Sequence, residues 1–147
     1  MPLFDSFAIS ASGMTSNRLW LDLITNNIVN INTAGKPGDS GLQPYKRQVP
    51  VFSELLETTL NSSPGKESYN RMGVHVPRVT EDSASPRMVH DPSHPYADEN
   101  GYVAYPNINI ANEMVNMLTA TRAYEASVTA LNSAKSMAMK ALEIGRG

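Results

Sequence analysis

The stretch N-N-I-V-N-I-N-T-A-G-K, Asn26 to Lys36, closes an apolar-periodic run that begins near the start of the chain. It places four asparagines within seven residues, where a helix would favour Ala, Leu or Lys. Asn is a poor helix former, tolerates left-handed backbone and carries an amide that both donates and accepts hydrogen bonds. We expect Asn30 and Asn32 to stop the helix and satisfy its last carbonyls. Asn26 and Asn30, four residues apart, share a face that could meet another subunit's backbone; the alternative is a frayed helix end.

The residues before this stretch carry a heptad pattern. Of nine positions that alternate by four and three, seven are apolar. These seam positions are Leu3, Phe7, Met14, Leu21, Ile24, Ile28 and Ile31. The pattern predicts an amphipathic helix of about four repeats, roughly 40 Å long at about 1.5 Å per residue.

The far end of the chain repeats the pattern, with eight apolar residues in ten positions. The apolar members are Ile110, Met114, Met117, Tyr124, Val128, Leu131, Ala138 and Leu142. Asn107 or Asn109 can cap the start of this helix, Glu113 lies favourably in its first turn, and Gly145 ends it. A second long helix is therefore predicted.

Each seam is broader than one helix can bury alone, so the two helices should pack against each other. The predicted fold class is mainly α, with long N- and C-terminal helices packed as a coiled-coil-like pair and a small β-containing extended middle. The corresponding segments are residues 1–33, 34–106 and 107–147, of which the first and last form one domain. Periodicity leaves open whether this is a helical hairpin in a monomeric domain or a pair that completes its burial with neighbouring subunits.

The middle segment has the Gly, Pro and Asn content of loops and short strands. We expect a loop over 33–44, then an extended strand over 45–52 that Pro50 interrupts, and a short helical turn over 52–60. A flexible tip is expected over 61–66 and an edge strand over 74–79. Residues 91–106 should be extended, with a tight turn at Asn100 and Gly101.

Composition excludes several classes of partner. The chain has 147 residues, 41% of them hydrophobic, with a net charge of −2 and no cysteine, which fits one or two small domains without disulfides or zinc–thiolate sites. Its twelve Lys and Arg are scattered, so we expect no nucleic-acid partner. No apolar stretch approaches the roughly 18 to 20 residues of a membrane span, and no cleaved signal peptide is expected.

The most metal-like pair of residues is His90 and His94, spaced as in helical zinc sites. Pro92 and Pro95 make a continuous helix through both histidines improbable, so a loop of solvated or hydrogen-bonding histidines is the favoured interpretation. We therefore expect no metal site.

Other candidate sites have similar structural explanations. The adjacent carboxylates Glu81 and Asp82 have no nucleophile or metal-ligand set beside them, which favours a solvated charged turn. Met114, Met117, Met137 and Met139 are expected to be packing groups on the second helix. We expect no catalytic residue, cofactor or small-molecule substrate, and no enzymatic activity.

Passages at both ends of the chain resemble the bacterial flagellar rod, hook and hook-associated axial proteins. The residues that carry this signature are Ser12, Gly13, Met14, Asn26, Asn27, Asn30, Asn32 and Thr33 at one end, and Asn107, Asn109, Glu113, Met114, Arg122 and Tyr124 at the other. In the middle, residues 44–48, 89–95 and 100–103 resemble the proximal rod type. Many axial proteins continue their first signature directly after the threonine, whereas here a Gly- and Pro-rich insert precedes Pro44.

The resemblance implies a structural subunit of the basal-body rod that polymerises through its terminal helices and transmits motor torque to hook and filament. Its implied partners are copies of itself, other rod proteins and the flagellar type III export apparatus. It implies location beyond the inner membrane after export without a cleaved signal. The alternative is a soluble coiled-coil adaptor, which would form a small closed oligomer.

Overall fold

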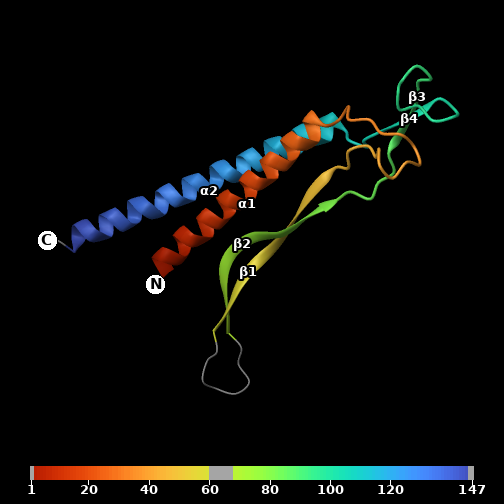
Figure 1. Cartoon of the computed structure of the whole chain (residues 1–147). Coiled ribbons are helices and arrows are strands. Elements are labelled where there is room, and N and C mark those ends of the chain that lie inside the picture. Colours follow the sequence, from red (N-terminus) through yellow and green to blue (C-terminus); the bar gives the residue numbers. More distant parts are fainter. Residues whose placement is uncertain (1, 60–67, 146–147) are drawn as a thin grey trace. The chain divides into compact units, whose positions relative to one another are not determined.

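The computed structural model describes residues 2–59 and 68–145 (Figure 1). Its elements are α1 (Pro2–Val29), β1 (Gln48–Thr59), β2 (Ser68–Glu81), β3 (Arg87–His90), β4 (Tyr102–Tyr105) and α2 (Ile110–Ile144). Within the described residues, neither helix combines the length and the apolar character that crossing a membrane requires. The tip expected over 61–66 lies outside the described residues.

Asparagines define both helix boundaries, as the sequence predicts. α1 ends at Val29, and the Asn30 side chain donates to the carbonyl oxygen of Asn26 at 2.9 Å. At the start of α2, Asn109 Oδ1 accepts from the backbone N–H of Ala111 at 2.9 Å, so Asn109 is the N-cap. Gly145 follows the last helical residue, as expected.

The chain divides into two compact units. Unit 1 consists of Met1–Trp20, Val51–Arg78 and Thr119–Gly147, and unit 2 of Leu21–Pro50 and Val79–Leu118. Both long helices and both long strands therefore contribute residues to each unit.

In unit 1, α1 binds the backbone of β2 through serine side chains. Ser12 Oγ accepts from the N–H of Val74 at 3.1 Å, and Ser16 Oγ donates to the carbonyl of Val74 at 3.3 Å. Gly73, with φ of +123°, allows this approach, because a Cβ there would collide with Ser12 Oγ. Also on α1, a Cβ on Gly13 would lie 3.0 Å from Ser127 Oγ of α2, so the two helices are closely packed at this level.

Unit 2 contains the antiparallel pair β3–β4, the first residues of β1 and the last residues of β2. Arg87 faces Tyr105 and His90 faces Tyr102 in the β3–β4 register. Beside β4, Gly35 exchanges two backbone hydrogen bonds with Ala104, of 2.8 and 3.1 Å. The largest fully buried apolar side chains here are Ile24 and Val103.

The predicted fold class, a mainly α chain built on a coiled-coil-like helix pair, is wrong. The structure is mixed: helices of 28 and 35 residues accompany strands of 12, 14, 4 and 4 residues in two two-stranded sheets. The short helical turn expected over 52–60 is replaced by β1, because pairing with β2 overrides the local helix propensity of Glu and Leu. Pro50 lies inside β1, which is tolerated because each strand of a two-stranded sheet has one edge without ladder hydrogen bonds.

Two other expectations for the middle segment are confirmed. Residues 74–79 belong to a strand, which extends over the longer range of β2. Asn100 and Gly101 close a tight turn in which Gly101, with φ of +77°, donates to the carbonyl of Asp98 at 3.0 Å.

The helix contact differs from a coiled-coil seam in the residues that it buries. On α2 the buried positions are Glu113, Ala120 and Ala134, which lie on a line of every seventh residue with the half-buried Ser127. None of these four is a large apolar residue. The large seam residues Met117, Tyr124, Val128 and Leu131 are only half-buried, so the described part of α2 lacks the fully buried knobs of a coiled coil. The large side chains of Ile110, Met114 and Leu142 are instead 48%, 61% and 67% exposed.

We predict that Gly35→Ala destabilises unit 2. An added Cβ would overlap the backbone of Leu42 and Pro44, and backbone cannot move aside as a flexible side chain can. Overpacking of this kind costs about 1 to 3 kcal/mol, measurable as a lower urea midpoint. Gly41→Ala is the matched control in the same loop, because its Cβ would make only an ordinary 3.4 Å contact with Asp39. Equal stability of the two variants would contradict the close packing at Gly35.

Candidate functional site

Asn27 is the most completely hydrogen-bonded side chain of unit 2, and only 1% of it is exposed. Its Nδ2 donates to the carbonyl of Gln48 at 2.9 Å and to Glu113 Oε2 at 3.2 Å. Its Oδ1 accepts from the N–H of Gln48 and from the hydroxyl of Tyr45, both at 2.9 Å. All donor and acceptor positions of the amide are therefore used.

Glu113 is equally buried, with 1% exposed, and carries the charge of the site. Its Oε1 accepts from Arg47 Nε at 2.9 Å and lies 2.7 Å from the guanidinium Nη2. The remaining guanidinium nitrogen, Nη1, lies 3.5 Å from Asp82 Oδ2. Arg47 thus bridges a buried carboxylate and a half-buried one, and every charge in the cluster has a partner of opposite sign.

These residues, which we call the polar cluster, are Asn27, Tyr45, Arg47, Gln48, Asp82 and Glu113. They come from α1, the segment entering β1, the residue after β2, and the first turn of α2. An ion pair removed from water stabilises only when its remaining hydrogen-bonding positions are satisfied, and here they are. The cluster therefore fixes four segments of unit 2 against one another.

Burial raises the pKa of the Tyr45 phenol above its ordinary value, and the negative charge of Glu113 adds to the shift. Both causes disfavour a phenolate at this position. Tyr45 therefore remains a hydrogen-bond donor to Asn27 over the neutral range of pH.

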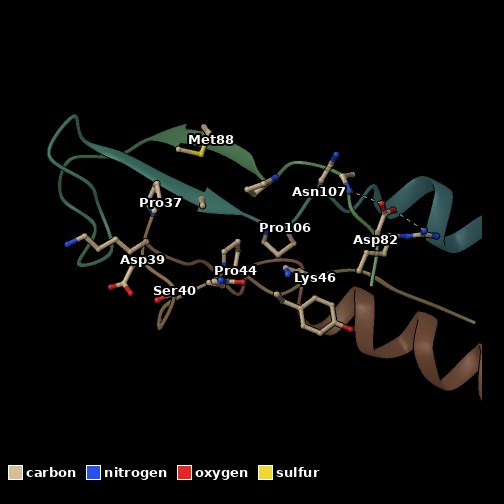
Figure 2. A pocket seen from close by; sticks show the side chains of 17 residues that line it. Pro37, Asp39, Ser40, Pro44, Lys46, Asp82, Met88, Pro106 and Asn107 are labelled. Carbon is tan, nitrogen blue, oxygen red and sulfur yellow. Dashed lines mark hydrogen bonds and ion pairs between the residues drawn. The ribbon is translucent and has the colours of Figure 1, made fainter. Parts of the chain in front are cut away.

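Beside the cluster lies a cavity of about 480 Å³, also within unit 2 (Figure 2). Pro37, Pro44, Met88 and Pro106 form apolar parts of its wall, and Asp82 marks the side shared with the polar cluster. Among the described residues, no group of three or more His, Asp or Glu is placed to bind a metal ion. The chemistry of this region is that of packing and ion pairing.

Comparison with known proteins agrees with this structural character. The family model described as "Flagellar basal body rod FlgEFG protein C-terminal" matches residues 99–144. Proteins called flagellar basal-body rod protein FlgC align along the whole chain: one from Bacillus subtilis is 38% identical over 99% of this chain and 100% of its own length. One from Borreliella burgdorferi is 39% identical over 100% of both chains, and one from Escherichia coli O157:H7 is 35% identical over 99% of this chain and 100% of its own.

The chain belongs to the FlgC family of flagellar basal-body rod proteins. This confirms the resemblance to the proximal rod type, and it makes the chain a structural component of the rod. The Gly- and Pro-rich insert before Pro44, which departs from the wider axial family, is compatible with membership in the FlgC family because the relatives align across it.

The residues predicted to form the packing and assembly seam occupy three environments in this FlgC-family chain. Ile24 is buried; Phe7, Met14, Leu21, Ile28, Ile31, Met117, Tyr124, Val128 and Leu131 are half-buried; Ile110, Met114 and Leu142 are exposed. The side chain of Leu3 lies outside the described part of the chain. Whether the exposed members contact neighbouring subunits remains a prediction.

The signature asparagines separate into different roles. Asn26, Asn32, Asn107 and Asn109 are exposed and Asn30 is half-buried, whereas Asn27 is enclosed in the polar cluster. Asn27 binds the backbone of Gln48 in its own chain. That Asn26 and Asn30 share a face for another subunit's backbone stays a prediction. Of the other signature residues, Ser12 and Gly13 contact β2 and α2 in unit 1, and Arg122 forms an exposed ion pair with Glu125.

The histidines are parts of a folded loop and sheet. His94 Nδ1 accepts from the N–H of Tyr96 at 3.1 Å, and the His90 ring packs edge-on against Tyr102 with centroids 5.2 Å apart. Glu81 forms an exposed ion pair with Lys46 at 3.3 Å, as a solvated turn would, but Asp82 is half-buried beside Arg47. The expectation of a solvated turn is therefore wrong for Asp82.

Of the four methionines expected to be packing groups, Met117 is half-buried, whereas Met114, Met137 and Met139 are 61%, 61% and 54% exposed. A packing role for these three stays a prediction. The pairing of Arg47 with Glu113 was not predicted from the sequence. Glu113 lies seven residues before Ala120, on a helix face whose other members are small and buried or half-buried, and an acid on such a face indicates a buried partner.

We predict that Glu113→Gln lowers the free energy of unfolding by about 3 kcal/mol, because it leaves a partly buried Arg47 without its main counter-charge. Urea denaturation measures the loss. Glu125→Gln removes an ion pair whose side chains are 74% and 55% exposed, so it should change stability by less than about 0.5 kcal/mol. A Glu113→Gln loss no larger than that of the control would show that the polar cluster does not stabilise the fold.

The raised pKa of Tyr45 predicts a specific alkaline response. A pKa that is higher in the folded than in the unfolded state gives stability that is present below pH 10.0, the ordinary value, and is lost as pH rises through the folded value. Tyr45→Phe should lower stability at neutral pH by about 1 kcal/mol through loss of the hydrogen bond to Asn27. It should also flatten the decline in stability above pH 10.0 relative to the parent. Parallel alkaline profiles of the two proteins would contradict the assignment.

Proposed function

We propose that this rod component polymerises through α1 and α2, with copies of itself and with other rod proteins, into a shaft that transmits motor torque to hook and filament. In this proposal residues 1–33 and 107–147 act together as the polymerising segment, and the role is structural rather than catalytic. Export through the flagellar type III apparatus without a cleaved signal, and a position beyond the inner membrane, belong to the same proposal and rest on the family resemblance.

The observation that carries the proposal is the large apolar surface that α2 leaves exposed. Ile110, Met114, Leu118, Leu142 and Ile144 are each between 48% and 82% exposed. They form two groups, one at each end of α2, and groups of exposed apolar side chains mark association surfaces. The first three are spaced by four, so they share one helix face.

The polar cluster suits a subunit that carries torque. A torque-bearing subunit must resist deformation at the junction between its helices and its strands, and ion pairs with directed hydrogen bonds fix geometry more strictly than apolar contacts do. In unit 2 these bonds hold both helices and both long strands. The adaptor alternative requires a continuous large-residue seam between two helices, and the small-residue line on α2 does not provide one.

The proposal predicts that Met114→Glu abolishes assembly without unfolding the subunit. Met114 is exposed, so the isolated chain should change in stability by less than about 0.5 kcal/mol. In a dry subunit interface the same unpaired carboxylate costs several kcal/mol and recurs at every copy. Swimming in soft agar, by cells that lack the native protein, and the chain content of isolated basal bodies measure the effect.

Asn112→Glu is the matched control. It adds the same charge to an exposed position two residues away, about 200° around the helix from Met114. Normal swimming with Met114→Glu would remove the assembly role of this face. Loss of swimming with both variants would show that charge near the start of α2, rather than its apolar face, is what assembly cannot tolerate.

A further inference from the structure

The cavity of unit 2 has a rigid apolar wall. Its contributors include Pro37, Pro44, Pro86, Pro106 and Met88. Proline has a fixed φ and no N–H donor, so this wall neither yields easily nor offers hydrogen bonds to a polar ligand. A cavity of about 150 Å³ accepts a benzene-sized apolar group, and 480 Å³ therefore has room for more than one aliphatic side chain.

In the described part of the chain, most of the charged side chains around the cavity have a hydrogen-bond or ion-pair partner, but Lys36 does not. Asp39 Oδ1 accepts from the N–H of Gly41 at 2.8 Å, and Asp82 accepts from Ala84 and pairs with Arg47. Lys46 pairs with Glu81. Within residues 2–59 and 68–145, the ammonium of Lys36 has neither a hydrogen bond nor an ion pair, although its residue lines the cavity. The complementary ligand is an apolar side chain with a carboxylate close by.

β1 carries that combination. The strand contains two glutamates and neither Lys nor Arg from Gln48 to Thr59. Phe52, Leu55 and Leu56 are each 41% to 43% exposed. Side chains alternate along a strand, so Glu54 and Leu56 lie on one face. The exposed apolar segment at the end of α2 has Lys140 beside Glu143 and lacks this acidic character. At the exposed apolar start of α2, the nearby Glu113 is buried and paired with Arg47.

From this complementarity we propose that the cavity of one copy binds the β1 strand of a second copy, with Leu56 entering the cavity and Glu54 pairing with Lys36. The inference rests on the proposed polymerisation and names one of its contacts. Because the cavity and the strand are different surfaces, the contact is head-to-tail, and repeated head-to-tail contacts give an open helical polymer.

Cysteine cross-linking tests the contact directly, because the chain has no cysteine of its own. We would combine Met88→Cys, in the cavity wall, with Leu56→Cys and oxidise basal bodies isolated from motile cells. A disulfide forms when the two Cα atoms are about 4.4 to 6.8 Å apart. The expected result is a ladder of disulfide-linked copies of this chain. Met88→Cys with Ile9→Cys is the control, since Ile9 is 42% exposed but lies on α1, and it should give no ladder.

Charge reversal tests the same contact without cysteines. Lys36→Glu and Glu54→Lys should each reduce swimming, and the double variant should restore it. Four results would each overturn the proposed contact. They are the absence of a ladder from motile cells, a cross-link within one copy, a cross-link to a different rod protein, and failure of the double variant to restore swimming. In those cases the presence of the chain in basal bodies leaves the proposed polymerisation standing, whereas its absence there would overturn the polymerisation itself.

Discussion

Unit 2 depends on keeping one buried carboxylate fully paired. A carboxylate without a partner in a site that excludes water costs several kcal/mol, so Glu113 requires a cation and hydrogen-bond donors wherever the rest of the unit folds. Arg47 and Asn27 meet that requirement from two other segments. Once they are in place, the hydrogen bonds of Asn27 fix the path of the chain into β1. The middle of the sequence is therefore integral to the helical part of the molecule.

Glu113 also begins a line of small or buried residues on α2. Glu113 occupies the first position of a line that continues every seven residues through Ala120, Ser127 and Ala134. Small side chains let the backbones approach closely, as Gly13 does opposite Ser127. Met114, one position after Glu113, is 61% exposed, whereas Val128, one position after Ser127, is half-buried.

Some features of the fold could be predicted from the sequence and others could not. The helix ends were predictable because their determinants are local: Asn30 and Asn109 act on backbone groups within four residues. Buried residues on α2 do recur every seven positions, but the predicted seam was chosen by large apolar residues, and it therefore contained Met114 in place of Glu113. Arg47 lies 66 residues from Glu113, and no periodicity links them. The strand over residues 52–59 was missed for a related reason, since its conformation is decided by β2 rather than by its own Glu and Leu residues.

The distribution of apolar side chains predicts that assembly and stability are coupled if the chain polymerises as proposed. Half of the six fully buried hydrophobic residues in the described chain are alanines, which remove little apolar surface from water when they are buried. Far larger side chains, Ile144 and Leu142 among them, remain 82% and 67% exposed. A contact that buries these side chains in a polymer binds the folded state and not the unfolded one, so it adds its free energy to folding. In the proposed polymer, the polar cluster would fix the geometry of unit 2, and burial between subunits would add the stability that the small core lacks.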